Sequence, residues 1–128
     1  MRTEKLKKSE EQKLTQILLE NHPDFIYFKD SNGRFQHVSK SFCEFFRCSK
    51  EDIIGKTDLE LFPEEAAKQM HEEDLRVINT GIPLINKEEN AKGIWFLTTK
   101  IPWYDKDGKK KGLFGISRDI TERKKTEL

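Results

Sequence analysis

The 128-residue sequence has little of what marks several protein classes. It has only two cysteines, Cys43 and Cys48, whose spacing fits neither a zinc site nor a disulfide framework, so we expect two reduced thiols, at least one in the core. No apolar run approaches the roughly 20 residues of a membrane-spanning helix, and the N-terminus is too polar for a secretory signal. We therefore expect a cytoplasmic segment with no direct membrane insertion. A longer parent chain anchored in a membrane elsewhere is compatible with this pattern.

An excess of one charge is also missing. The 24 basic and 23 acidic residues are interspersed, which argues against a nucleic-acid partner. Lys109, Lys110 and Lys111 form the one basic cluster, and because they follow Asp107-Gly108 we interpret them as a solvated turn. Large apolar residues are sparse at 1–13 and 122–128, whereas all nine Phe, both Trp and both Tyr lie between. The composition predicts one modest core between two charged flanking segments.

Catalytic constellations are absent from the sequence. It has no nucleophile beside a base, no metal-ligand cluster and no phosphate-binding glycine loop. Its histidines, His22, His37 and His71, are scattered, and none has the helical context of a phosphoacceptor followed by a nucleotide-binding domain. We expect this segment to be non-enzymatic and without a metal site, so that any kinase or cyclase activity would lie beyond Leu128.

The pattern of apolar residues predicts an α+β fold with helices on one face of a five-stranded antiparallel sheet. A stripe containing Leu14, Ile17 and Leu18 predicts a flanking helix over 4–20, ended by His22-Pro23. Asn32-Gly33 between apolar runs predicts a hairpin. The remaining expected elements are short helices over 41–46 and 49–55, a long helix from Pro63 to Thr80 stopped by Gly81, and strands over 84–88, 94–104 and 112–118.

The segment 112–125 runs from an apolar strand directly into a charged helix. Asp119 and Glu122 stand three apart, the spacing of a capping box, which predicts a stiff corner between strand and helix. We interpret Asp119, Ile120, Thr121 and Glu122 as a signal connector. The alternative is an ordinary helix cap without a signalling role.

Four blocks of sequence, in order, resemble the Per-Arnt-Sim (PAS) family of sensory domains: 28–35 (FKDSNGRF), 49–58 (SKEDIIGKTD), 74–81 (DLRVINTG) and 115–124 (GISRDITERK). The resemblance implies the PAS fold and a sensor module of bacterial or archaeal signalling proteins. Such modules usually precede a histidine kinase, a cyclic-dinucleotide enzyme or another sensory domain, as in two-component phosphorelays. It also implies that Asp119-Ile120-Thr121 couples the sheet to the exit helix. The expected organisation is a flanking helix at 1–20, a PAS domain at 21–121 and the start of a connector helix at 122–128.

The resemblance leaves the cofactor open, because family members bind haem, flavin, small carboxylates or nothing detectable. Flavin photochemistry is not expected, since the family's Asn-Cys-Arg motif is missing and 55–62 contains no Cys. His71 lies on the long helix, where haem-binding members carry their axial ligand, but the acidic neighbours at 72–74 suit haem propionates poorly. We expect neither haem nor flavin, and an unknown small molecule or an empty pocket instead.

Any ligand pocket should be lined by the long helix and the last three strands. On the 94–104 strand, the odd positions form the more apolar set, so we predict that they face the core. The candidate pocket residues are therefore Met70, His71, Ile78, Trp95, Leu97, Thr99, Ile101 and Trp103. The alternative is that these side chains only fill the core.

Two functions remain open from the sequence. The domain either senses a small ligand, or it is a ligand-free dimerisation and protein-interaction module that relays an upstream conformational signal. In both cases we expect a homodimer through the flanking helices and a downstream effector domain in the same chain.

Overall fold

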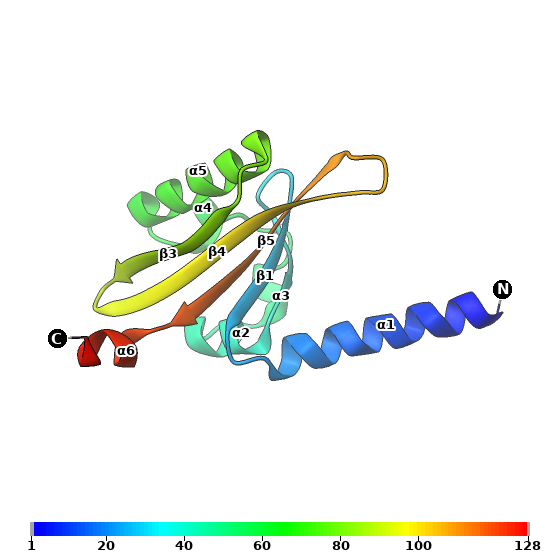
Figure 1. The fold of residues 1–128 in the computed structure, drawn as a ribbon, viewed down its shortest axis with the longest axis horizontal. Coiled ribbons are helices and arrows are strands. Elements are labelled where there is room, and N and C mark those ends of the chain that lie inside the picture. The colour runs from blue at the N-terminus through cyan, green and yellow to red at the C-terminus, as the bar shows by residue number, and fades with distance from the viewer. Residues whose placement is uncertain (1, 128) are drawn as a thin grey trace.

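The computed structural model describes residues 2–127, and the side chains of 9–127. The predicted flanking segments also include residues 1 and 128, which lie outside the described part. The helices are α1 (Arg2–Asn21), α2 (Lys40–Phe46), α3 (Lys50–Ile53), α4 (Asp58–Leu61), α5 (Glu64–Thr80) and α6 (Thr121–Thr126) (Figure 1). The strands are β1 (Phe25–Asp30), β2 (Phe35–Val38), β3 (Leu84–Ala91), β4 (Ile94–Tyr104) and β5 (Lys110–Asp119). The predicted fold class and strand number are confirmed.

The five strands form one antiparallel sheet in the order β2-β1-β5-β4-β3. Strand β1 pairs with β5 along its length, with Phe25 opposite Ser117 and Asp30 opposite Gly112. The chain therefore enters the sheet beside the point where it leaves it. From that shared end of the sheet, α1 and α6 extend to opposite sides of the domain (Figure 1).

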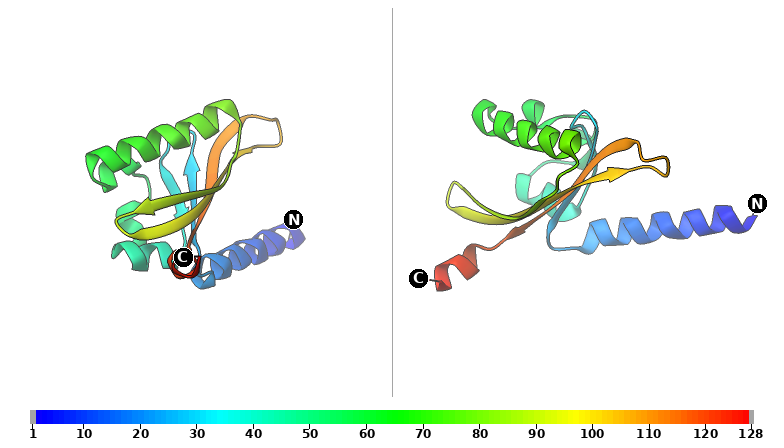
Figure 2. Two further views of the ribbon diagram at one scale, coloured as in Figure 1. Left: turned by 60° about the vertical axis from the view of Figure 1, so that its left-hand side comes forward. Right: turned by 45° about the horizontal axis from the view of Figure 1, so that its top comes forward.

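Helices α2 to α5 cover one face of the sheet, while α1 projects from the domain and contacts α2 (Figure 2). Local signals in the sequence set the bounds of α5. Pro63 precedes its first turn, and Gly81 ends it in the left-handed region at φ 72°, donating to the carbonyl of Val77. Between these helices and the sheet lies the hydrophobic core, which contains Tyr27, Phe35, Val38, Phe42, Ile53, Val77, Ile78 and Leu113.

The predicted hairpin between β1 and β2 is confirmed. Gly33 takes φ 79°, and the carboxylate of Asp30 accepts hydrogen bonds from the backbone N–H groups of Asn32 and Arg34, both at 2.9 Å. The turn is thus held by its own side chain as well as by the strand pairing.

The predicted orientation of β4 is wrong. Thr98 and Lys100, at even positions, are buried beneath the helices, with exposed fractions of 3% and 5%. The predicted pocket residues Trp95, Leu97, Thr99, Ile101 and Trp103 point to the opposite face, because side chains alternate along a strand. The prediction assumes that the more apolar face of β4 lies in the core. This assumption fails because α5 directs the carboxylates of Glu73 and Asp74 toward β4, and Lys100 pairs with them there.

Candidate functional site

Four charged side chains meet inside the domain, and we call them the ionic cluster: Lys29 of β1, Asp58 of α4, Asp74 of α5 and Lys100 of β4. None is more than 5% exposed. Lys29 Nζ lies 2.7 Å from Asp58 Oδ2 and also contacts Asp74 Oδ2, while Lys100 Nζ lies 2.7 Å from Asp74 Oδ1. The ionic cluster therefore joins the centre of the sheet to the two helices above it.

Glu73 extends the ionic cluster to the surface. Its carboxylate lies 2.8 Å from Lys100 Nζ and 2.6 Å from Lys87 Nζ on β3. The side chain of Lys87 is 45% exposed, whereas the side chain of Lys100 is only 6% exposed. A continuous path of charge thus runs from solvent at β3 to Asp58 in the interior.

Sequence reasoning missed the ionic cluster because it assigned charged residues to the solvent. A usable signal was present. Asp74 lies seven residues after Ala67 and four before Ile78, on the buried stripe of α5. On β1, Lys29 shares its face with Tyr27, two residues earlier. Opposite charges on two inward stripes are the pattern that predicts a buried ion pair.

The environment fixes the charge of most members. Burial alone would raise the pKa of Asp74, but attraction to Lys29 and Lys100 outweighs it and lowers that pKa. Burial likewise opposes the charged form of Lys100, yet Tyr27 and the carboxylates of Asp74 and Glu73 raise its pKa. Asp58 differs, because burial raises its pKa and Asp74 adds to the rise, against the opposing effect of Lys29. Asp58 is thus the carboxyl of the cluster most readily protonated.

Aromatic rings complete the surroundings of Lys29. Its Nζ lies 4.4 Å from the ring centroid of Phe35 and 5.3 Å from that of Tyr27, within cation–π range. Burial raises the pKa of the Tyr27 phenol, so this ring stays neutral. Asp58 Oδ1 is buried and has no hydrogen-bond partner among the described residues. The cluster thus holds opposite charges in the buried interior, where Asp58 Oδ1 is an acceptor without a protein partner among the described residues.

A small apolar cavity of about 230 Å³ lies beneath α2, α3 and α4. This volume is below the roughly 300–1,000 Å³ of ordinary ligand pockets. Its lining consists of Phe42, Phe46, Cys48, Ile53, Leu61 and Phe62. None of the predicted pocket residues is among them, so the structure does not bring the predicted set together around this cavity.

The helical members of the predicted pocket take three different places. Ile78 is in the core at 1% exposure, and Met70 is half-buried. The His71 ring packs on the β1–β2 hairpin, since a Cβ built on Gly33 would lie 2.9 Å from its Cε1. Haem ligation by His71 is not tested by this placement and stays a hypothesis.

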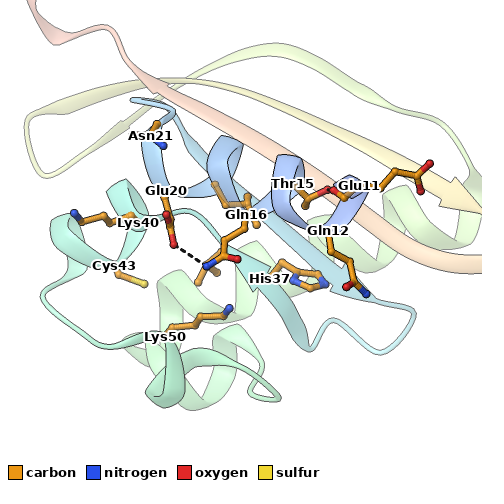
Figure 3. Close-up of a pocket in the computed structure, with 12 residues that line it drawn as sticks. Glu11, Gln12, Thr15, Gln16, Glu20, Asn21, His37, Lys40, Cys43 and Lys50 are labelled. Carbon is orange, nitrogen blue, oxygen red and sulfur yellow. Dashed lines mark hydrogen bonds between the residues drawn. The ribbon is translucent and has the colours of Figure 1, made fainter. Parts of the chain in front are cut away.

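A larger groove of about 1190 Å³ separates α1 from β2, α2 and α3 (Figure 3). Figure 3 shows polar side chains of α1, such as Gln16 and Glu20, facing Cys43 and Lys50 across it. Leu19 is the one buried residue among the described side chains of α1, at 8% exposure. Helix α1 is thus loosely packed on the domain, and Leu19 near its C-terminal end makes the buried contact.

The connector is formed, but without the predicted capping box. Asp119 Oδ1 accepts from the Thr121 backbone N–H at 2.9 Å and from its hydroxyl at 2.6 Å, and no side chain caps α6. Glu122 instead pairs with Lys125. The predicted spacing failed because α6 begins two residues after Asp119, which leaves Asp119 one residue too early to cap it.

The connector is also bound to β4. The backbone N–H of Ile120 donates to the carbonyl of Trp95 at 2.8 Å, and the Trp95 N–H donates to the Thr121 hydroxyl at 3.1 Å. Lys124 contacts the Glu88 carboxylate, and its Nζ lies 4.8 Å from the Trp95 ring centroid. The first turn of α6 is therefore fixed to the edge half of the sheet.

A second contact joins the two ends of the domain. Asp24, between α1 and β1, is 8% exposed and pairs with Arg118, the residue before the connector. Arg118 Nε lies 3.2 Å from Asp24 Oδ1, and Nη2 lies 3.1 Å from Oδ2. The backbone carbonyl of Asp24 accepts from the Ser41 hydroxyl at 2.7 Å. We call the Asp24–Arg118 pair the end clamp.

Residues 19–125 match the sequence profile of a family described as the PAS fold. The chain belongs to the PAS family. The PAS domain from Bordetella pertussis BvgS has a similar structure, with a TM-score of 0.74, 26% identity and 92% of each chain covered. These matches agree with the resemblance of the four sequence blocks.

Two curated relatives of this PAS domain are signalling proteins. The aerobic respiration control sensor protein ArcB of Escherichia coli K12 is 26% identical over 84% of this chain. The methanogenesis regulatory histidine kinase FilI of Methanothrix harundinacea is 28% identical over 88%. The chain spans only 14% and 13% of their lengths, so it corresponds to one part of each. A sensory signalling role is consistent with both.

The described residues contain neither a membrane-spanning helix nor a metal-binding group. No helix among them is long and apolar enough to cross a membrane. No group of three or more His, Cys, Asp or Glu side chains within the described range is placed to hold a metal ion.

Proposed function

We propose that this PAS domain is a conformational relay of a sensor protein, which passes a change at α1 through the Asp119-Ile120-Thr121 connector to a downstream effector such as a histidine kinase. The end clamp is the observation that carries the proposal. It binds the segment after α1 to the residue before the connector, so a shift of one displaces the other. The domain itself is non-catalytic in this proposal, and the effector follows it in the same cytoplasmic chain.

The filled interior supports a relay over a large-ligand sensor. The ionic cluster and the aromatic core occupy the space between sheet and helices, and the apolar cavity among α2, α3 and α4 has only about 230 Å³. Relay modules act on dimeric effectors, and α1 offers a dimer contact. Leu14, Ile17 and Leu18 are 66%, 56% and 52% exposed, at helical spacing. We propose that they pack on the same helix of a second copy.

A ligand sensor is the second candidate, and the unpartnered Asp58 Oδ1 favours it, because a buried acceptor without a partner is rare. The ligand would be small and carry a hydrogen-bond donor. Native mass spectrometry of the purified chain, with its absorption spectrum, separates the two functions. A bound species of defined mass would favour the sensor, and a Soret band lost in His71→Ala would favour haem. A clean mass after exposure to cell extract would favour the relay.

Hydrogen exchange tests the relay. We expect Arg118→Gln to release the end clamp and to speed exchange about two- to fivefold at both the Ile120 amide and the end of α1, since partly exposed ion pairs contribute modestly. The matched control is Arg34→Gln, which breaks the exposed pair with Glu60 away from the connector. Changes confined to one side of the clamp, or equal to those of the control, would contradict the proposed coupling.

A further inference from the structure

The turn that ends α2 brings the two cysteines together. Arg47 follows the helix in the left-handed region, at φ 52° and ψ 46°. The Cys48 N–H donates to the Cys43 carbonyl at 3.1 Å, and the Arg47 N–H donates to the Glu44 carbonyl at 3.3 Å. These two bonds define a Schellman motif, in which the residues at the positions of Cys43 and Cys48 pack against each other.

This motif brings the two cysteines close to the separation that a disulfide requires. A 3.1 Å hydrogen bond from the N–H of one residue to the carbonyl of the other holds their Cα atoms within about 7 Å. Disulfides span Cα distances of roughly 4.4–6.8 Å. The five-residue spacing fits no zinc site. At the end of a helix that closes in a Schellman motif, however, this spacing brings the two residues next to each other.

The electrostatics of the two thiols agrees with their proximity. Burial raises the pKa of Cys43, and the charge of Cys48 adds to the rise. Burial also raises the pKa of Cys48. Both side chains are half-buried and reduced. They are therefore within interaction range of each other and partly open to a small reagent.

We infer that Cys43 and Cys48 form a reversible intramolecular disulfide, which makes the end of α2 a redox-sensitive modification site. The oxidant is a low-molecular-weight disulfide such as glutathione disulfide. The thiolate of one cysteine attacks a sulfur of the oxidant and releases one thiol, giving a mixed disulfide. The second cysteine attacks the protein sulfur of that bond and releases the second thiol. Two protein thiols are oxidised and one disulfide is reduced, so atoms and electrons balance.

The place of the bond gives it a structural effect. Cys43 lines the groove below α1, and Cys48 lines the apolar cavity. Oxidation ties these two walls together and fixes the turn between α2 and α3. Since α1 contacts α2, the disulfide also alters the surface on which α1 rests. The site is separate from the end clamp, so its test does not depend on the relay.

The experiment is a redox titration of the 128-residue protein in anaerobic glutathione buffers, quenched with acid, alkylated and measured by intact mass. We expect a species lighter by two hydrogens, with the bond mapped to Cys43 and Cys48 by peptide analysis. Its formation should be faster at higher pH, because the thiols ionise late. Cys48→Ser should trap a mixed disulfide on Cys43 instead.

The matched control is C43S/E44C, which keeps two thiols but moves one to the exposed neighbouring position. We expect it to need at least about tenfold more glutathione disulfide for half oxidation, as the closing step loses its geometry. Circular dichroism verifies that both proteins are folded. Independent glutathione adducts on both cysteines of the native chain, disulfides between chains only, or equal titration of native protein and control would each overturn the inference.

Discussion

Lys29 and Lys100 lose their hydration when the protein folds, which costs free energy. Ion pairs with the carboxylates of Asp58, Asp74 and Glu73 offset part of this cost. This offset depends on every partner being present, because removing one partner leaves an unpaired charge in a dry interior. Of these carboxylates, Glu73 is the partner nearest solvent. Hydrogen bonds from Lys100 and Lys87 outweigh its burial and lower its pKa below the ordinary 4.5. The residues of the cluster thus make stability depend on pH.

The sign of that dependence follows from the direction of each shift. For Glu73 and Asp74, whose pKa values are lowered on folding, the stabilisation is present above their unfolded values of 4.5 and 3.8, and is lost as the pH falls through the folded values. Asp58 has a raised pKa, so its contribution is present at low pH and is lost as the pH rises through the folded value. We expect Glu73→Gln to flatten the loss of unfolding free energy below pH 4.5, and Asp58→Asn to steepen it.

Urea unfolding at a series of pH values measures both effects. Glu72→Gln is the matched control, because this neighbouring side chain on α5 is exposed. Curves for Glu73→Gln and Glu72→Gln that run parallel below pH 4.5 would show that the pairs of Glu73 with Lys87 and Lys100 do not control acid stability.

Gly115 on β5 is constrained by the size of a neighbouring side chain, the ring of Tyr27 on β1. A Cβ at this position would lie 2.2 Å from the Tyr27 ring, while its backbone conformation suits any residue. We expect Gly115→Ala to lower the unfolding free energy by about 1–3 kcal/mol through overpacking. Urea denaturation measures the loss. In the double variant with Tyr27→Leu the two effects should be less than additive, and full additivity would place the strain elsewhere.

At the scale of elements, local signals predicted boundaries better than orientations. Pro63 and Gly81 set the ends of α5, and Asn32-Gly33 set the hairpin, because each acts on its own backbone. The inward face of β4 depends on what α5 presents across the core, and the carboxylates there are distant in sequence. For the same reason the ionic cluster and the end clamp could not be predicted from either strand alone.

At the connector, substitutions can distinguish the predicted capping box from the observed hydrogen bonds between Asp119 and Thr121. Because Asp119 accepts hydrogen bonds from Thr121 whereas Glu122 pairs with Lys125, we expect Asp119→Ala to lower the local opening free energy of α6 by about 0.5–1.5 kcal/mol. Exchange of the Thr121 and Lys124 amides reports this change. Glu122→Ala is the control and should leave both amides unaffected. Equal effects of the two substitutions would instead favour the capping box.

At the scale of the whole molecule, the sheet order places β1 and β5 side by side in the centre, with β4 and β3 beyond them. Both flanking helices therefore act on the same strand pair. The edge strand β3 is linked to α6 through Glu88 and Lys124, so the exit helix contacts the sheet on its other half as well.

The position of the end clamp also determines how the domain responds to force. Because β1 begins where β5 ends, pulling α1 and α6 apart loads their hydrogen bonds one after another, as in a zipper, rather than all together in shear. Rupture in such a geometry starts at the loaded end, and the Asp24–Arg118 pair lies there. Between β1 and β5 the protein is therefore mechanically soft along the direction in which its two helices leave it, and the ion pair is the first contact between these two strands that a small tension would test.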